Sequence, residues 1–187
     1  MRAAVISGVA VVLLVLAGCA DSEAGQARPE ALPTQTGLPA DYEAPTIADP
    51  LEPGRFANDP CALLSEERRI ELGLPDAERK ERFGTFECLL HPPGDRITTV
   101  QVKLMLDRGL ADLVEMCRGE YAPESCESWG PTEVERYPAI LDTGGLCRLM
   151  TGVAERMVVL VVTLEEPGCR KATEISETAV ATLRESA

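Results

Sequence analysis

The chain has 187 residues, enough for one domain of ordinary size with flanking tails. Its 18 basic and 31 acidic side chains leave a net charge of −13, which disfavours nucleic-acid binding because phosphate recognition needs a basic surface. Hydrophobic residues at 45% allow a core and exclude wholesale disorder, whereas aromatic residues at 4% disfavour aromatic cages and sugar-binding sites.

The first residues are typical of an export signal. Met1 and Arg2 give a positively charged start, and residues 3–16 form an apolar run interrupted only by Ser7 and Gly8. As a helix, this run rises about 21 Å, short of the ~30 Å hydrocarbon core of a bilayer. The run therefore fits a cleaved signal better than a permanent membrane span.

Residues 16–19, with the sequence Leu-Ala-Gly-Cys, resemble a bacterial lipobox. The resemblance implies that residues 1–18 are a lipoprotein signal peptide and that Cys19, the new N-terminus, carries a diacylglyceryl group. Two acyl chains anchor a protein stably, whereas one gives only marginal binding. We therefore expect the mature protein at the outer face of the cytoplasmic membrane. The alternatives are an ordinary signal peptide, which would release a secreted protein, and an uncleaved N-terminal anchor.

The cysteine count agrees with export. The chain has seven Cys, and assigning Cys19 to the lipid leaves six, an even number suited to disulfides in an oxidising compartment. Six cysteines allow fifteen connectivities, and parity does not choose among them.

Residues 19–57 are predicted to form a disordered tether that begins at the lipidated cysteine. The stretch lacks periodicity and is interrupted by six prolines: Pro29, Pro33, Pro39, Pro45, Pro50 and Pro53. Such a composition does not bury enough apolar surface to offset the entropy of ordering. A flexible chain of this length spans roughly 35 Å, which would hold the folded part clear of the lipid. A Pro-rich docking ligand is the alternative.

Residues 58–187 are predicted to form a single domain. The expected elements of its first half are a short helix capped by Ser65 and ending at Gly73, a charged loop over 75–82, strands over 85–91 and 97–106, and a helix over 109–118. The turn 91–95 separates the two strands.

The second half begins with a loop over 120–131 that holds Cys126 and Trp129. The elements expected after it are a strand over 132–140, a turn over 142–145, strands over 146–152 and 157–164, and a helix over 169–184. Pro138 places the first of these strands at an edge or bulge, and the strand over 157–164 is apolar on both faces and should be central. The order is helix-strand-strand-helix, then strand-strand-strand-helix. We therefore predict an α+β fold, with an antiparallel sheet of about five strands covered by helices.

Several short motifs resemble an actinobacterial lipoprotein family known as domain of unknown function 3558. They are the lipobox, the Pro-rich spacer, Asp59-Pro60-Cys61-Ala62-Leu63-Leu64-Ser65 through Gly73, Cys88 in a strand, Pro138-Ala139, Cys147 in a strand, and Pro167 to Cys169 before an Ala-rich helix. Two features depart from the family pattern: Leu90 replaces an aromatic residue, and Cys117 with Cys126 look like an additional pair. The resemblance implies a surface lipoprotein with structural disulfides and implies no reaction.

The family spacing, together with the repeated placement of one Cys before a helix and one in a strand, favours the pairs Cys61–Cys88 and Cys147–Cys169. Cys117–Cys126 is the pair that remains. Each bridge would stabilise the domain by roughly 2–4 kcal/mol.

Catalytic and metal-binding motifs are not found in the sequence. There is no Cys-x-x-Cys, and His91, the single His, is interpreted as a solvated turn residue. Acidic pairs at Glu66-Glu67, Glu165-Glu166 and Glu133 with Glu135 are interpreted as solvated surface. We expect neither a metal nor a cofactor.

Three function classes remain open. We expect a non-enzymatic binding or interaction module at the cell envelope, with a monomeric domain, a membrane contact through the lipid on Cys19, and an envelope protein as partner. The alternative is a carrier for a small apolar or lipid ligand held between the helices and the sheet. The third class is an unrecognised hydrolase.

Overall fold

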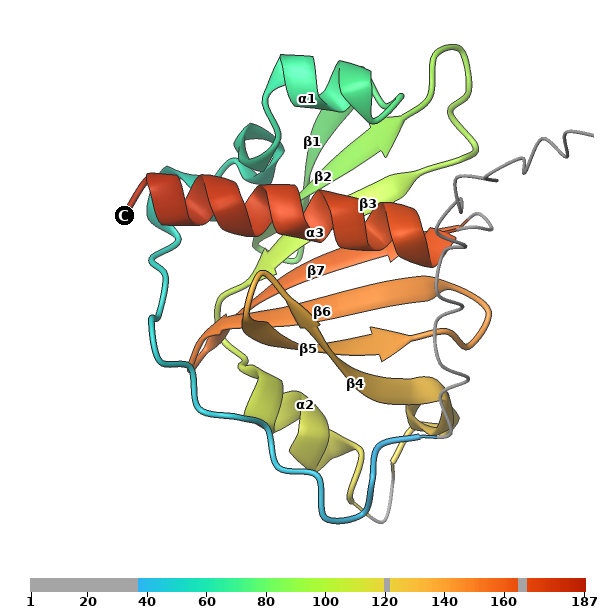
Figure 1. Cartoon of the computed structure of the whole chain (residues 1–187). Helices are drawn as coiled ribbons and strands as arrows, with labels where there is room; N and C mark the ends of the chain where they lie inside the picture. The colour runs from blue at the N-terminus through green and yellow to red at the C-terminus, as the bar shows by residue number, and fades with distance from the viewer. Residues whose placement is uncertain (1–36, 120–121, 165–167) are drawn as a thin grey trace, which may run out of the picture. The chain divides into compact units, whose positions relative to one another are not determined.

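The computed structural model describes residues 37–119, 122–164 and 168–187 (Figure 1). The predicted signal peptide and Cys19 lie outside the described residues. A seven-stranded antiparallel sheet in the order β1-β2-β3-β7-β6-β5-β4 forms the centre of the fold. The α+β prediction is confirmed, but the expected count of about five strands is wrong by two.

The strands are β1 (Asp76–Arg82), β2 (Thr85–His91), β3 (Val100–Met105), β4 (Trp129–Val134), β5 (Tyr137–Asp142), β6 (Cys147–Ala154) and β7 (Met157–Thr163). The helices are α1 (Glu66–Glu71), α2 (Leu110–Met116) and α3 (Gly168–Glu185), with short 3₁₀ turns η1 (Gly54–Ala57), η2 (Pro60–Leu63) and η3 (Glu124–Ser128). No helix among the described residues is long and apolar enough to cross a membrane.

The first additional strand is β1, in the stretch that we predicted to be a charged loop over 75–82. It pairs only with β2, through a two-residue turn at Phe83-Gly84, and its side chains are mostly exposed. An edge strand that is open to water on both faces does not need alternating apolar and polar residues. Residues 76–82 therefore lack the period-2 pattern by which a strand is recognised in a sequence.

The second additional strand arises because the predicted strand over 132–140 is a hairpin, β4 and β5. The chain reverses at Glu135 and Arg136, which have φ of 50° and 68°. Neither residue is the Gly, Asn or Asp that usually marks such a turn, so the sequence carried no turn signal. Pro138 lies one residue before the β5–β6 ladder begins at Ala139, where its missing N–H is tolerated.

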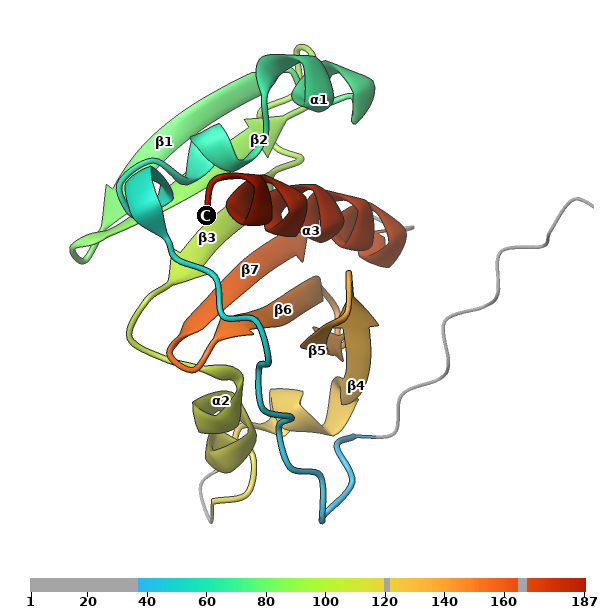
Figure 2. The ribbon, with the colours of Figure 1, turned by 60° about the vertical axis from the view of Figure 1, so that its left-hand side comes forward.

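Helix α3 packs across one face of the sheet (Figures 1 and 2). Its predicted apolar face is confirmed, since the following side chains are all 0% exposed: Ala172, Ile175, Ser176, Ala179, Val180 and Leu183. Strand β7 lies in the middle of the strand order, as its continuous apolar sequence predicted.

Helix α2 packs on the opposite face. Residues Ile140, Met150 and Val158, which alternate with those facing α3, form a second buried cluster with Leu110 and Trp129. A Cβ at Gly109 would lie 1.7 Å from the Glu155 carbonyl oxygen in the β6–β7 turn, so only glycine fits at the start of α2.

Residues 37–57 are not a disordered tether in this structure; this described part of the predicted 19–57 tether packs along the domain, and we call it the N-terminal strap. Leu51 and Phe56 are buried, and the Leu51 N–H donates to the Val153 carbonyl at 2.8 Å. The Tyr137 hydroxyl donates to the Asp49 carbonyl at 3.0 Å. The strap forms no ladder, so its apolar residues have no regular spacing that composition-based reasoning would detect.

The strap runs past α2 and ends in η1 (Figure 2, blue to teal). Its start lies near η3, since a Cβ on Gly37 would be 3.3 Å from the Glu127 carbonyl oxygen. Seventeen residues, 20–36, therefore separate Cys19 from the strap.

Candidate functional site

Three disulfides connect different elements of the fold, and two of them join a helix or turn to the sheet. Their Cα atoms are 4.9 Å apart for Cys61–Cys88, 5.7 Å for Cys117–Cys126 and 5.2 Å for Cys147–Cys169. The first links η2 to β2, the second links the end of α2 to η3, and the third links β6 to the start of α3. These are the pairs expected from the sequence, and together they account for the six cysteines other than Cys19.

His91 is not the solvated turn residue that we predicted. It is the last residue of β2, is 8% exposed, and pairs across the ladder with Asp76. Its Nδ1 lies 3.4 Å from the Thr99 hydroxyl, because the loop after β2 folds back over the strand end. The turn begins at Pro92, one residue later than the predicted turn over 91–95, so His91 belongs to the sheet.

Cys126 and Trp129 are also more ordered than the predicted loop over 120–131. Cys126 lies in η3, and Trp129 begins β4 and is 5% exposed. The disulfide to Cys117 and the pairing of Trp129 with Asp142 order this segment.

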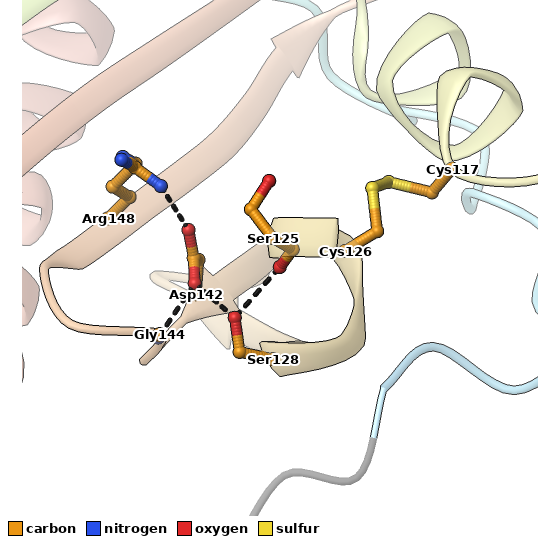
Figure 3. Close-up of polar contacts among 7 residues, drawn as sticks. All are labelled: Cys117, Ser125, Cys126, Ser128, Asp142, Gly144 and Arg148. Atoms are coloured by element: carbon orange, nitrogen blue, oxygen red, sulfur yellow. Dashed lines mark hydrogen bonds and ion pairs between the residues drawn. A yellow bond between two sulfur atoms is a disulfide. The ribbon is translucent and has the colours of Figure 1, made fainter. Parts of the chain in front are cut away.

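Asp142 is the centre of a buried polar cluster (Figure 3). It is 0% exposed, and its Oδ1 accepts from the Ser128 hydroxyl at 2.6 Å and from the Gly144 N–H at 2.9 Å. Its Oδ2 pairs with the Arg148 guanidinium at 2.6 Å. The Ser128 hydroxyl also contacts the Ser125 carbonyl at 2.8 Å. We predicted Asp142 as a turn residue, and its burial could not be read from turn chemistry.

This cluster has a structural role, because its hydrogen bonds and ion pair connect segments of the chain. A hydrolytic triad would need the single His beside Ser128 and Asp142, but His91 lies on β2, four strands from β5, or about 19 Å away at the usual strand spacing. Because three donors already occupy the Asp142 carboxylate, it holds η3 and the β5–β6 turn together.

An open groove of about 540 Å³ lies along the C-terminal half of α3. It is lined by residues of η1, η2, α1, α3 and the β4–β5 turn: Arg55, Ala62, Ser65, Arg68, Glu135, Glu177, Thr178, Ala181, Thr182 and Glu185. Arginines come from η1 and α1, and carboxylates come from α3 and the β4–β5 turn. The groove therefore presents both charges on a polar surface.

Local contacts hold these side chains in place. The Ser65 hydroxyl accepts from the Arg68 N–H at 3.2 Å and caps α1, as predicted. The Arg68 Nε donates to the Thr178 hydroxyl at 3.3 Å and so connects α1 to α3. Glu135, which lines the groove, pairs with Arg184 of α3 at 3.4 Å.

Glu177 is the groove carboxyl whose pKa is raised. Partial burial, followed by the nearby carboxylates of Glu135 and Glu174, raises the pKa of Glu177, and only Arg68 opposes the shift. A cationic group that entered the groove would relieve this repulsion. The sequence did not single out Glu177, because it is one of 31 acidic residues and its neighbours come from distant segments.

The surface acids that we named lie where expected in the described part of the chain. Glu66, Glu67, Glu133 and Glu135 are exposed, whereas 165–166 lie outside the described residues. No group of three or more His, Cys, Asp or Glu in the described ranges is arranged to hold a metal ion.

A family model described as a protein of unknown function (DUF3558) matches residues 14–182, so the chain belongs to this family. No curated protein and no solved structure matches the chain.

Proposed function

We propose that this DUF3558 protein is a lipoprotein of the cell envelope, anchored through Cys19 at the outer face of the cytoplasmic membrane, and acts as a non-enzymatic binding module. The groove along α3 is the observation that carries the binding role. In this proposal it receives a cationic segment, such as a Lys or Arg side chain, of another envelope protein.

Export is supported by the cysteine chemistry. Paired cysteines persist in oxidising compartments and are rare in the reducing cytosol. With six cysteines in three pairs, Cys19 remains as the one available for lipid, which fits the lipobox.

The groove supports recognition of a polar partner. Its carboxylates and guanidiniums come from separate segments that are fixed by the Ser65 cap and the Arg68–Thr178 hydrogen bond. A preformed site loses little side-chain entropy on binding. Burial and then the carboxylates of Glu135 and Glu174 raise the pKa of Glu177, and an incoming cation would stabilise its ionised form.

The carrier alternative needs an apolar cavity between the helices and the sheet. That layer is filled by side chains, since Ile175 and Val180 of α3 and Leu149 of the sheet are all 0% exposed. The hydrolase alternative needs an activated serine, whereas Ser128 donates to Asp142, which lies on β5, four strands from the strand that carries His91. We therefore favour the binding module.

Site-specific photo-cross-linking in the native host tests the binding role. A photoreactive residue at Ala181 in the groove should give one discrete adduct, whereas the same residue at Arg170, exposed at the other end of α3, should give none. The charge-reversal variant Glu177→Lys should abolish the adduct without lowering protein abundance. Equal adducts at both positions, or an adduct that Glu177→Lys leaves unchanged, would contradict the proposal.

A further inference from the structure

The two edges of the sheet differ in how open they are to a further strand. Strands β1 and β4 are the outer strands, at opposite ends of the strand order (Figure 2). Val134 and Tyr137 flank the β4–β5 turn and form a hydrogen-bonded pair, so the backbone of Pro131, three residues before Val134, faces outward. Pro131 is exposed and has no N–H to donate, which disfavours the addition of a strand at this edge.

Strand β1 has no such block. It is seven residues long, contains neither Pro nor a bulge, and is mostly exposed. Arg82 and Thr85 flank the β1–β2 turn and form a hydrogen-bonded pair. The backbones of Ala77, Arg79 and Glu81 therefore face outward. No backbone hydrogen bond formed outside the strands by the described residues satisfies these groups, so the edge of β1 is open to another strand.

The charges of β1 are complementary to those of a second copy of β1. The strand has three acidic and three basic residues, so it is neutral on a chain with a net charge of −13. In an antiparallel pair centred on Arg79, all seven residues lie opposite a residue of the second copy. Asp76 then lies opposite Arg82 of the second copy, and Glu78 lies opposite Lys80 of the second copy. Two-fold symmetry repeats each of these pairs, and opposite charges that face each other across two strands stabilise the pairing.

The ion pairs present within one chain are compatible with this arrangement. Glu78 and Lys80 lie 3.5 Å apart, so with the same two residues of the second copy they form a ring of alternating charge. Arg82 contacts Glu87 through its Nε at 2.8 Å, and its side chain remains 63% exposed. Its terminal nitrogens therefore still reach Asp76 of the second copy.

Arg79 is the one residue of β1 that faces its own counterpart in this register. Its guanidinium lies over the Phe86 ring, 5.0 Å from the ring centroid, and donates to the Asn58 carbonyl at 3.1 Å. Phe86 belongs to β2, so this contact draws the cation inward from the edge. The two like charges at the symmetry axis are therefore held back, each by its own chain.

The same register agrees with two lipid anchors in one membrane. The two-fold axis of an antiparallel strand pair is perpendicular to the sheet, so both copies turn their α2 sides in the same direction. The strap begins on that side, since Leu38 and Tyr42 pack against the cluster that α2 forms with the sheet. Residues 20–36 reach at most about 60 Å when extended, so both proposed anchors reach a bilayer that the α2 sides face.

We infer that two copies of this protein associate edge to edge through their β1 strands, in an antiparallel register centred on Arg79. The pairing adds about six backbone hydrogen bonds and joins the two sheets. This inference departs from the monomeric domain expected from the sequence and does not depend on the α3 groove. A contact of one strand per copy is small and weak in solution, and anchoring both chains on one membrane raises their effective concentration.

Cysteine cross-linking of the full chain in its own host tests the register. Ala77 is expected opposite Glu81 of the second copy, and the Cα atoms of such a pair lie about 5.5 Å apart, within disulfide range. Chains with Ala77→Cys and Glu81→Cys, expressed together and oxidised with copper phenanthroline, should give at least about five times more disulfide-linked dimer than either variant alone. Ala77→Cys alone is the matched control, because the two copies of residue 77 lie about 14 Å apart along the strands.

A charge exchange in the same cysteine background tests the complementarity. Glu78→Lys in both chains should lower the cross-linked fraction about tenfold, because like charges then face each other in two places, and Lys80→Glu in both chains should do the same. Glu78→Lys in one chain and Lys80→Glu in the other restores both pairs, so cross-linking should recover. The recovery excludes misfolding of either variant as the cause of the loss. Arg170→Glu, which changes the charge of an exposed residue on α3, should leave cross-linking unchanged.

Equal cross-linking in the mixed and single-cysteine samples, the absence of a dimer after oxidation, or no recovery in the charge exchange would overturn the inference. A cross-link from position 77 to a different protein would also overturn it and would identify that protein as the source of the added strand. Lipidation is measured separately by detergent partition of the full chain with and without Cys19→Ala. Failure of the anchor and failure of the strand pairing therefore give different results.

Discussion

Replacing Asp142 tests whether its buried cluster staples η3 to the β5–β6 turn. In Asp142→Ala the Gly144 N–H and the Arg148 guanidinium lose their acceptor, and Ser128 keeps only the Ser125 carbonyl. Breaking a buried ion pair costs about 3–5 kcal/mol, and because the Arg148 side chain is 35% exposed, solvation recovers part of this. We expect a loss of about 2–4 kcal/mol in the free energy of unfolding.

Asp142→Asn should cost less, about 1–2 kcal/mol, because its amide oxygen still accepts from Ser128 and Gly144 and only the charge pair is lost. Urea unfolding followed by fluorescence is the assay, since Trp129 is the single Trp and lies directly opposite Asp142 in the ladder. Circular dichroism gives a global check, and an unchanged m-value confirms that stability alone has changed. A loss below about 0.5 kcal/mol for Asp142→Ala, or equal losses for both variants, would refute the reasoning.

Three further predictions concern the disulfides, the groove and the strap. Cys147–Cys169 and Cys61–Cys88 span 22 and 27 residues, whereas Cys117–Cys126 spans nine. Because a longer loop constrains the unfolded chain more, removing either long-range disulfide should destabilise the domain by about 1 kcal/mol more than removing Cys117–Cys126. Equal unfolding midpoints would contradict this order. Glu177→Gln should raise the melting temperature at pH 7, because a raised folded-state pKa means that the ionised carboxylate destabilises the fold. The gain should vanish as the pH falls below the ordinary pKa range of Glu, where the carboxyl is protonated in both states. A gain that persists at pH 3 would contradict this prediction. Leu51→Ala should cost about 2–3 kcal/mol of unfolding free energy if the strap is part of the core, and no measurable change would restore the disordered-tether interpretation.

The sequence predicted those elements whose burial follows a regular period. Helix α3 buries one stripe, and β7 is buried on both faces at the centre of the sheet, so their apolar patterns identified them. The pairs Cys61–Cys88 and Cys147–Cys169 followed from the family spacing and from the placement of one Cys before a helix and one in a strand, and Cys117–Cys126 was the pair that remained. The cap at Ser65 followed from local chemistry alone.

The sequence failed where tertiary contacts replace a regular pattern. Strand β1 is charged because it lies at an edge, and the Glu135-Arg136 turn is held by ion pairs and has no turn-forming residue. The strap is fixed by contacts with distant residues such as Tyr137 and Val153, which no local pattern reveals. The groove combines η1, α1, α3 and the β4–β5 turn, so its charges become neighbours only in the folded chain.

Intact-mass spectrometry of the protein extracted from membranes of its own host tests the central claim, a lipid-anchored and disulfide-stapled module, most directly. The account predicts a chain that begins at Cys19, carries a diacylglyceryl group, and has six hydrogens fewer than the reduced form because all six remaining cysteines are paired. A mature chain that begins at another residue, lacks the lipid mass, or contains a free thiol among these six cysteines would contradict it.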